Sequence, residues 1–442
     1  MELANKHIAV LGLGESGEAA AALLAEGGAV VAVLDSAEAQ ALEPRMSRLR
    51  KLGVRLIEGR ASETDAARYD LGVLSPGIDP ASPLVRNFVA KRIEMIGELE
   101  FAWQLCKCPV IAITGSNGKT TTTSLVAEIF TACGKRTVAA GNISPAFSAV
   151  VKQSGELDIM ALEVSSFQLE EIRTFRPRIA AWLNLSPNHL DRYPSMEAYR
   201  AAKLRIFENQ TPEDFAVVNL RESLPPLAAK IITFSAYATG GDFDLRNGVI
   251  HFQNQPVFDM AEAQLKGLHN VENIMAALAI GHVEGLGFEA MAPAIRAFMA
   301  PPHRCELVGI LDGVRWINDS KSTSLEATEK ALLAEDRPVI LIAGGKDKGF
   351  EFDPLASLVA EKCRHAVLIG QMAQRIANSW KDASCHLAAD LNDAIRIARS
   401  LAQPGDVVLF SPATSSFDMF KNYIDRGDQF RSVVQQLAPN NP

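Results

Sequence analysis

The chain lacks the cysteine pairs that mark a zinc knuckle or a redox dithiol. Its six cysteines are scattered through 442 residues, and no CxxC motif occurs. The closest spacing, Cys106-Lys107-Cys108, is wrong for either kind of site. The remaining interpretation is that the cysteines are reduced and buried in a cytosolic protein.

Long hydrophobic runs are also absent. No stretch of about 18 apolar residues occurs, so a membrane-spanning helix is not expected. The start, MELANKHIAVLGLG, lacks the basic and continuous apolar regions of a signal peptide, so we expect a cytoplasmic protein without a membrane partner. With 48% hydrophobic, 22% charged and 7% aromatic residues, the composition excludes a chain that is wholly disordered or fibrous.

An excess of positive charge is missing as well. The formal net charge is −8, whereas a nucleic-acid binder usually presents a basic face. A polyanionic ligand would therefore have to be held by local devices, such as helix N-termini, single lysines and metal ions. At roughly 150 residues per domain, the length suggests about three domains.

The first segment is typical of a strand–helix–strand unit with a parallel sheet. HIAVLGLG, EAAAALLAEGG and AVVAVLD follow one another, and further strands are expected at VRLIEG and DLGVLSPG. Gly12, Gly14 and Gly17 lie between the first strand and the helix, and Asp35 ends the next strand. This pattern fits a nicotinamide or flavin enzyme, any other nucleotide with a pyrophosphate such as a UDP-sugar, or glycines that only permit close packing.

The second segment begins with a phosphate-binding loop. Residues 110–113 form an expected strand, the loop runs from Thr114 to Thr120, and a helix follows. Small residues let backbone N–H groups surround phosphate, Lys119 would contact the β- and γ-phosphates, and the Thr120 hydroxyl would bind Mg²⁺. Ile113 stands where a full Walker A motif has glycine, so the match is to the shorter TGxxGKT form. The loop predicts ATP or GTP binding.

The rest of this segment and the third segment continue the α/β pattern. DIMALEV, RIAAWLNLS and DFAVVNL read as buried parallel strands, and Glu163 at the end of the first of them is a candidate Mg²⁺ ligand. Residues 231–260 read as a small antiparallel excursion. Pro301-Pro302 reads as a linker. After it, RWINDS, PVILIAGG, HAVLIG and DVVLFSPA alternate with helical stretches in a third α/β unit.

Taken together, the motifs resemble those of the Mur ligases of peptidoglycan synthesis. TGSNGKTTT, LEVSSFQLE, NHLDRYPS, YRAAKLRIFEN, GLHNVEN, PPHRCE, NDSKST and SPATSSFD occur in that order along nearly the whole chain. SSFQLE and HLDRYPS are similar to the member of the family that adds D-glutamate.

The resemblance implies an α/β fold of three domains. They are a Rossmann-like N-terminal domain that holds a UDP substrate (1–97), a P-loop-type central ATPase domain with a mainly parallel sheet (98–301), and a Rossmann-like C-terminal domain that binds the amino acid and closes over the site (302–442). It also implies the reaction. ATP converts the carboxylate of UDP-N-acetylmuramoyl-L-alanine to an acyl phosphate, and the amine of D-glutamate then displaces phosphate to form an amide.

The resemblance further implies the site residues, including two Mg²⁺ sites and a lysine carbamate. Lys203, which from the residues alone is a solvated lysine on an amphipathic helix, would be carbamylated. The catalytic residues would be Lys119, Glu163, His189 and carbamylated Lys203, and the metal ligands Thr120, Glu163, His189 and carbamylated Lys203. ATP would be bound by Gly115, Ser116, Asn117, Gly118, Lys119, Thr120, Thr121, Asn142, Asn273, Arg304, Asp319 and Lys321. The UDP substrate would be bound by Ser16, Asp35, Ser36, Gly77, Asn142 and His189, and D-glutamate by Thr323, Lys348, Ser416 and Tyr423.

Two residues depart from the family pattern, and other functions remain open. Tyr423 replaces a phenylalanine, and Glu15 replaces an apolar residue in the glycine turn, where its carboxylate should turn to solvent or meet the uracil edge. The alternatives are a sibling ligase, a folylpolyglutamate synthase-like ligase, a regulatory ATP-binding module and an NAD-dependent oxidoreductase, the last of which leaves TGSNGKTT unexplained. We expect a monomer without a nucleic-acid partner.

Overall fold

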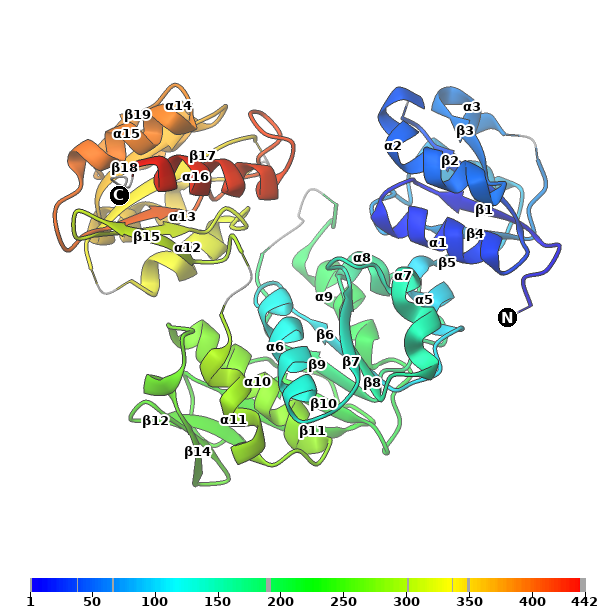
Figure 1. The fold of residues 1–442 in the computed structure, drawn as a ribbon, viewed down its shortest axis with the longest axis horizontal. Helices are drawn as coiled ribbons and strands as arrows, with labels where there is room; N and C mark the ends of the chain where they lie inside the picture. Colours follow the sequence, from blue (N-terminus) through cyan, green and yellow to red (C-terminus); the bar gives the residue numbers. More distant parts are fainter. Residues whose placement is uncertain are drawn as a thin grey trace. The chain divides into compact units, whose positions relative to one another are not determined.

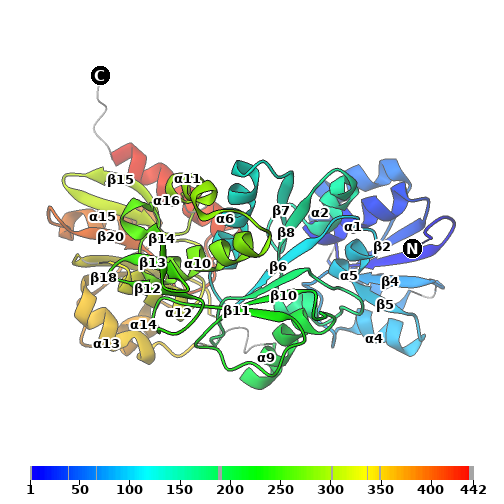
Figure 2. The same ribbon diagram turned by 90° about the horizontal axis from the view of Figure 1, so that it is seen from below.

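The structure is a computed structural model (Figures 1 and 2) that describes residues 2–37, 39–65, 67–187, 192–299, 302–335, 337–347 and 350–437. Within these residues it contains sheets of five, nine and six strands. The chain divides into two compact units. Unit 1 consists of Met1–Leu185, Ser195–Asp259 and Glu272–Arg296, and unit 2 of Ser186–Pro194, Met260–Val271 and Ala297–Pro442. The expected boundaries at residues 97/98 and 301/302 remain predictions.

The first sheet lies in unit 1 and has the order β3-β2-β1-β4-β5, with parallel pairing throughout. Alternate residues of its strands face two different cores: Ile8 and Val10 pack with α1, whereas Ala9 and Leu11 pack with α4. This double burial explains the nearly continuous apolar runs of the strands. The elements are β1 (His7–Leu11), α1 (Glu15–Glu26), β2 (Val30–Asp35), α2 (Ala39–Leu49), η1 (Arg50–Leu52), β3 (Arg55–Glu58), α3 (Gly59–Thr64), β4 (Leu71–Leu74), α4 (Pro83–Ala90) and β5 (Met95–Gly97).

The second sheet, also in unit 1, has the order β14-β13-β12-β11-β10-β9-β6-β8-β7. Figure 2 shows β6, β8 and β7 side by side at one end of it. Its strands are β6 (Val110–Thr114), β7 (Thr137–Gly141), β8 (Ile159–Glu163), β9 (Ile179–Trp182), β10 (Phe215–Asn219), β11 (Lys230–Ser235), β12 (Phe243–Arg246), β13 (Val249–Phe252) and β14 (Gln255–Asp259). The helices in this part of the chain are α5 (Glu98–Trp103), α6 (Lys119–Ala132), α7 (Phe147–Val150), η2 (Val151–Gly155), α8 (Ser166–Leu169), α9 (Met196–Leu204), η3 (Arg205–Phe207), η4 (Met260–Glu262), α10 (Leu268–Val283) and α11 (Phe288–Ala297).

The expectation for residues 231–260 is partly wrong. β12, β13 and β14 form the predicted antiparallel meander, but β11 pairs parallel with both β10 and β12. Parallel neighbours run in the same direction, so the chain must return to the opposite edge of the sheet after β10 before β11 can begin. Residues 220–229 make this return. Parallel pairing therefore extends two strands further than predicted, through β11 to β12.

The third sheet lies in unit 2 and has the order β15-β16-β20-β17-β18-β19. The four predicted strands are present, but β15, which forms an antiparallel hairpin with β16, escaped prediction. Its signal was Asp312-Gly313, whose positive φ values of 52° and 77° suit a tight hairpin turn. The elements are β15 (Glu306–Leu311), β16 (Val314–Asn318), α12 (Leu325–Leu333), β17 (Val339–Gly344), α13 (Asp353–Lys362), β18 (Cys363–Ile369), α14 (Ala373–Ser379), β19 (Cys385–Leu387), α15 (Leu391–Leu401), β20 (Val407–Phe410) and α16 (Tyr423–Leu437).

The expected three-part α/β architecture is confirmed. Among the described residues, no helix is long and apolar enough to cross a membrane. The expectation of buried cysteines holds for Cys108 and Cys363 but is wrong for Cys305, which is exposed, and for the three others, which are partly exposed.

Candidate active site

The glycine turn of the first sheet is shaped by close packing. Gly12 has φ +91°, and a Cβ on Gly17 would lie 1.9 Å from the Gly12 carbonyl oxygen. The turn follows β1, which is flanked by β2 and β4, so the carboxyl ends of three parallel strands meet here. Small residues are therefore required by the geometry of this turn.

The two oxygens of Asp35 are both engaged with backbone amides. Oδ2 accepts the Leu13 N–H at 2.7 Å and Oδ1 accepts the Ala37 N–H at 2.9 Å. Asp35 thus ties the glycine turn to the loop after β2. Of the other residues predicted to bind UDP, Ser16 is half-buried, and Ser36 and Gly77 are exposed; the Glu15 side chain is also exposed.

A residue that the sequence analysis missed supports the same turn. Ser75 lies at the end of β4, is buried, and donates its hydroxyl to the Gly12 carbonyl oxygen at 2.9 Å. Its position at the end of the expected strand DLGVLSPG was the available signal. The three strand ends are thus linked by hydrogen bonds.

The phosphate loop joins β6 to α6 in unit 1. Gly118, which precedes the helix, has φ +82°, and a Cβ there would lie 2.3 Å from Oδ1 of Asn273. Asn273 also accepts the Thr122 hydroxyl at 3.2 Å. Thr121 is buried at the start of the helix. Asn273, predicted to bind ATP near the adenine, thus lies directly against the phosphate loop.

A second missed residue, Asn184, holds the phosphate loop in shape. Its side-chain oxygen accepts the Asn117 N–H at 2.9 Å, its side-chain nitrogen donates to the Asn117 carbonyl at 3.2 Å, and its backbone carbonyl accepts the Ser116 N–H at 2.9 Å. Glu222 fixes the same connection after β9 by accepting Leu185 N–H at 3.0 Å and the Trp182 indole N–H at 3.1 Å. Since Ser116 and Asn117 donate to Asn184, the amides at the start of α6 are the better phosphate ligands.

The side chains expected around the terminal phosphates lie together at this loop. Lys119 Nζ donates to the carbonyl oxygens of Gly115 at 2.9 Å and Ser116 at 3.1 Å. Residue 163 is in register with Ile113 on neighbouring β6, which brings its carboxylate to the loop. Oε2 of Glu163 lies 2.5 Å from the Thr120 hydroxyl, and Oε1 accepts the Asn142 amide at 2.7 Å.

This oxygen pair fits a hard divalent cation. Mg²⁺ is usually held by one or two carboxylates together with substrate phosphates and water, and the Glu163 carboxylate is buried beside a hydroxyl. Among the described residues, no three His, Cys, Asp or Glu side chains gather as a metal site. His189 lies outside the described residues, so of the two ligands predicted for the second metal site the structure describes only Lys203.

The interpretation of Lys203 as a solvated lysine is wrong. Its side chain is 1% exposed, Nζ donates to the Gly115 carbonyl at 2.9 Å, and it lies 4.8 Å from the centre of the Tyr199 ring. Burial and the nearby charge of Lys119 lower the pKa of Lys203 well below its usual value, against the opposing effect of Glu163. This shift increases the share of the neutral amine, which is the form that reacts with carbon dioxide.

In unit 2, three adjacent parallel strands direct their loops to one edge. β16, β20 and β17 are neighbours, and the loops after them carry NDSKST, SPATSSFD and GGKDKGF. The Lys346 N–H donates to the Ser415 carbonyl at 2.9 Å, which joins two of the loops. Ser416 is buried in one loop, Thr323 is half-buried in another, and Lys348 lies outside the described residues.

Asp319 is 4% exposed and is held by polar neighbours. It accepts the Ser411 hydroxyl at 2.8 Å, the Ser322 hydroxyl and the Cys305 N–H at 3.2 Å. Burial raises the pKa of Asp319 to about 6 despite these hydrogen bonds. Arg304 lies one residue before Cys305 and is half-buried.

Buried Arg426 connects the two loops that hold most of the predicted residues of this unit. It donates to the Ser320 carbonyl at 2.8 Å, the Ser320 hydroxyl at 3.0 Å and the Thr414 carbonyl at 3.2 Å. The Ser320 hydroxyl in turn donates to the Tyr423 carbonyl at 2.8 Å, and Lys321 Nζ lies 3.8 Å from the centre of the Tyr423 ring. Lys321 and Tyr423 are thus brought together.

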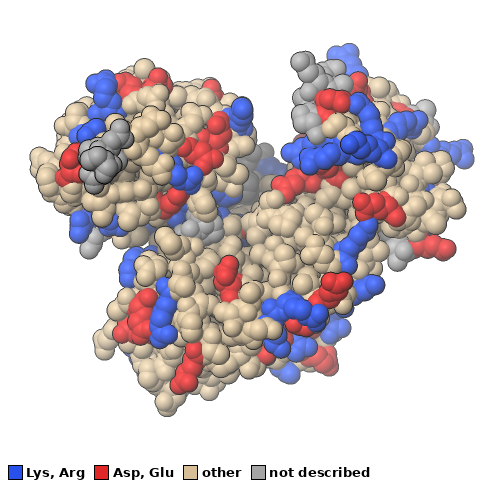
Figure 3. All heavy atoms as spheres, viewed as in Figure 1, with Lys and Arg blue, Asp and Glu red and all other residues tan. Residues whose placement is uncertain are grey.

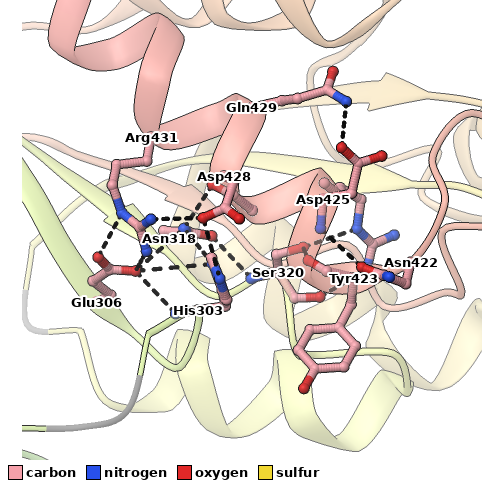
Figure 4. Close-up of polar contacts among 12 residues, drawn as sticks. His303, Glu306, Asn318, Ser320, Asn422, Tyr423, Asp425, Asp428, Gln429 and Arg431 are labelled. Carbon is pink, nitrogen blue, oxygen red and sulfur yellow. Dashed lines mark hydrogen bonds and ion pairs between the residues drawn. The ribbon is translucent and has the colours of Figure 1, made fainter. Parts of the chain in front are cut away.

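Figure 4 shows a further polar cluster in unit 2, centred on His303. The side-chain nitrogen of Asn318 lies 3.0 Å from His303 Nδ1, and Arg431 donates to both oxygens of Glu306 at 2.9 Å. The His303 N–H donates to Glu306 at 2.9 Å. The cluster therefore fixes the residue before Arg304 against α16. The sequence offered no signal for this role beyond the neighbouring prolines, of which Pro301 lies outside the described residues.

Charged side chains are mixed in sign on the surface. On the face drawn in Figure 3, Lys and Arg side chains are interspersed with Asp and Glu. Some charged side chains of unit 1 pair, as Arg48 and Arg45 do with Glu18 at 2.8 and 3.4 Å. Such exposed pairs contribute little stability.

A parallel α/β sheet with a phosphate loop opening α6 defines a P-loop-type nucleotide-binding protein. Three family models match the chain: "Mur ligase MurD-like, N-terminal domain" at residues 6–97, "Mur ligase middle domain" at 113–281 and "Mur ligase, glutamate ligase domain" at 303–414. The UDP-N-acetylmuramoylalanine–D-glutamate ligases of Geotalea uraniireducens and Geobacter metallireducens are 43% and 42% identical, each over 99% of both chains. The chain therefore belongs to the Mur ligase family.

Solved structures support the fold. The UDP-N-acetylmuramate-alanine ligase of Thermotoga maritima matches with a TM-score of 0.65 and 18% identity, over 98% of this chain and 100% of that chain. The MurF ligase of the same organism, solved in complex with ADP, matches with a TM-score of 0.62 and 16% identity, over 92% and 96%. At these identities the likeness shows the three-domain fold alone.

Proposed function

We propose that this protein is an ATP-dependent ligase that adds D-glutamate to UDP-N-acetylmuramoyl-L-alanine in peptidoglycan precursor synthesis. The structural observation that carries the proposal is the contact of Thr120 with Glu163 at the phosphate loop, 2.5 Å apart and beside Lys119. The amino-acid substrate is taken from the full-length relatives, which are named as D-glutamate ligases. The enzyme would act as a cytoplasmic monomer.

The phosphate loop would hold ATP through the amides at the start of α6 and through Lys119. Asn142 and Asn273, which contact Glu163 and Thr122, would complete the nucleotide site together with Arg304, Asp319 and Lys321 from unit 2. A carboxylate that attacks a polyphosphate brings like charges together, and Lys119 would offset that repulsion. A dinucleotide-dependent oxidoreductase would leave the phosphate loop TGSNGKTT without a role.

Thr120 and Glu163 would hold one Mg²⁺, and His189 with a carbamate on Lys203 would hold another. Bound there, Mg²⁺ would neutralise charge on the phosphates and on the reacting carboxylate. The lowered pKa of buried Lys203 supports the carbamate, since a protonated amine has no lone pair for attack on carbon dioxide. Asn184 and Glu222 would keep the loop in its binding shape.

The remaining residues would position the two other substrates. Ser16, Asp35, Ser36, Gly77, Asn142 and His189 would bind the UDP substrate, and Thr323, Lys348, Ser416 and Tyr423 would bind D-glutamate. Arg426 and Ser320 would hold the loops of unit 2 for this purpose. Closure of the C-terminal domain would exclude water, which otherwise hydrolyses an acyl phosphate.

The reaction would proceed in two displacements. A carboxylate oxygen of UDP-N-acetylmuramoyl-L-alanine attacks the γ-phosphorus and ADP leaves. The D-glutamate nitrogen then attacks the carbonyl carbon, the C–O bond to phosphate breaks, and the nitrogen loses a proton. One oxygen of the substrate carboxylate thus ends in inorganic phosphate.

An isotope experiment tests this route. UDP-N-acetylmuramoyl-L-alanine labelled with ¹⁸O in its carboxylate is incubated with ATP, Mg²⁺ and D-glutamate, and the phosphate is examined by mass spectrometry. We expect one ¹⁸O in each phosphate released. Label in AMP, or phosphate without label, would show that the carboxylate is not activated by phosphorylation.

A further inference from the structure

The connection between α5 and β6 turns two thiols toward each other. Sγ of Cys106 lies 4.0 Å from Sγ of Cys108, and the Cys106 thiol lies 3.4 Å from the carbonyl oxygen of Cys108. Between them, the Lys107 N–H donates to the Ser154 hydroxyl at 3.0 Å, which fixes the backbone of this segment. A disulfide needs the sulfurs at about 2.05 Å, so a side-chain rotation and a small backbone adjustment would close it.

The two thiols differ in exposure. Cys106 is partly exposed, whereas Cys108 is 8% exposed and packs in the core of unit 1. A small oxidant would therefore reach Cys106 first. The sulfur of Cys108 lies directly behind it, in the place of a resolving thiol.

The pKa shifts of the two thiols agree with this difference in exposure. Hydrogen bonding from the Cys108 thiol lowers the pKa of Cys106 to about 7 against the opposing effect of burial. The same interaction, together with burial, raises the pKa of Cys108. The lowered pKa favours the thiolate, the nucleophilic form, at Cys106, while Cys108 keeps its proton.

We propose that Cys106 and Cys108 form a peroxide-reactive dithiol that closes reversibly to an intramolecular disulfide. The ligand class is a small hydroperoxide, and the site is independent of the proposed ligase activity. The spacing of the two residues had argued against such a site; the turn around Lys107 brings the sulfurs together nevertheless.

The proposed step balances in two stages. The Cys106 thiolate attacks one peroxide oxygen and the O–O bond breaks, which forms a sulfenic acid on Cys106. The departing hydroxide takes up the proton that the Cys106 thiol had released and becomes water. The Cys108 sulfur then attacks the Cys106 sulfur, and the sulfenic oxygen leaves as water with the Cys108 proton. Two thiols are oxidised by two electrons, and hydrogen peroxide is reduced to two waters.

The test uses the full chain and hydrogen peroxide at pH 7. After brief exposure, the remaining thiols are blocked with N-ethylmaleimide, and peptides are mapped by mass spectrometry. We expect the peptide with Cys106 and Cys108 to lose two hydrogen atoms and to remain unblocked. Dithiothreitol should restore both thiols, while Cys133 and Cys363 should be blocked as in untreated protein, since burial raises the pKa of each.

The Cys108→Ala variant separates the role of Cys108 from that of the reactive thiol Cys106. In Cys108→Ala, Cys106 loses its hydrogen-bond partner, and its alkylation by iodoacetamide at pH 7 should slow about tenfold as its pKa returns toward about 8.5. The matched Cys133→Ala variant should leave the Cys106 rate unchanged. The proposal is overturned if wild-type Cys106 is oxidised to sulfinic acid while Cys108 remains free, or if other cysteines oxidise first. The mapping needs only the wild-type chain, so a folding defect of the variant cannot obscure the answer.

Discussion

At the residue scale, Asn184 supports the shape of the phosphate loop from outside the loop. It occupies both backbone polar groups of Asn117 and lies outside the loop itself. Asn184→Ala removes both side-chain hydrogen bonds, each contributing about 1 kcal/mol. We expect KM for ATP to rise about tenfold, with KM for D-glutamate nearly unchanged, in steady-state assays of phosphate release.

The control for this prediction is Asn378→Ala. Asn378 is exposed on α14 and accepts a hydrogen bond from Gln374 at 3.1 Å. Its removal should alter neither KM. An equal rise of both KM values in Asn184→Ala would contradict a specific role in the phosphate loop and would indicate general damage to the fold.

Lys203 carries a second prediction at this scale. Lys203→Ala removes the amine that would bear the carbamate, and we expect the turnover number to fall more than about 100-fold. Short carboxylic acids such as acetate should restore part of it by supplying an anionic oxygen in the vacated space. Loss of folding would not respond to acetate, so the rescue separates the two explanations. Full activity of Lys203→Ala without additives would contradict the proposed carbamate.

Individual residues could be predicted where a local sequence pattern indicates their position. Lys119, Thr120 and Glu163 could be predicted because strand ends and a glycine-rich loop place them at one edge. The burial of Lys203 could not be predicted from its own segment, since its helix reads as amphipathic. Asn184 and His303 act through contacts between segments far apart in the sequence, and no local pattern predicts such contacts.

At the element scale, α16 packs closely against His303 and Asn318 within unit 2. A Cβ on Gly427 would lie 2.1 Å from His303 Nδ1, and the Gly427 carbonyl accepts the Asn318 amide at 3.0 Å. Gly427→Ala should stabilise the helix itself by about 1 kcal/mol but cost about 1–3 kcal/mol in overpacking of the buried ring. We expect the overpacking to outweigh the helix gain and the urea midpoint of unfolding to fall.

Gly309→Ala is the matched control in the same unit. A Cβ at Gly309 on β15 would have no heavy atom within 4 Å. Its urea midpoint should stay within experimental error of the wild type. If Gly427→Ala instead raised the midpoint, helix propensity would outweigh packing and His303 would not be fixed by α16.

Elements were predictable where both faces of a sheet are buried. Strands β1, β2 and β4 of the first sheet and the core strands of the third read as apolar runs because alternate residues fill cores on opposite faces, as Ile340 and Leu341 of β17 do. Edge strand β15 was missed because its burial is incomplete and its apolar pattern correspondingly weak. The direction of β11 depends on a crossover, which alternation alone cannot reveal.

At the scale of the whole molecule, the net charge of −8 constrains how anionic substrates can be bound. An acidic protein that joins two anionic substrates with a third must concentrate its positive charge locally. Lys119 beside the phosphate loop and Lys321 against Tyr423 are two such positions, and Arg304, Lys348 and bound Mg²⁺ would supply the rest. Local placement, rather than composition, sets the affinity for polyanions.

The most direct test of the account is phosphate release from ATP with UDP-N-acetylmuramoyl-L-alanine and different amino acids. D-glutamate, L-glutamate, meso-diaminopimelate and L-lysine are compared at equal concentration. The account predicts strong stimulation by D-glutamate and little by the other three. No stimulation by D-glutamate, or greater stimulation by meso-diaminopimelate or L-lysine, would contradict the assignment.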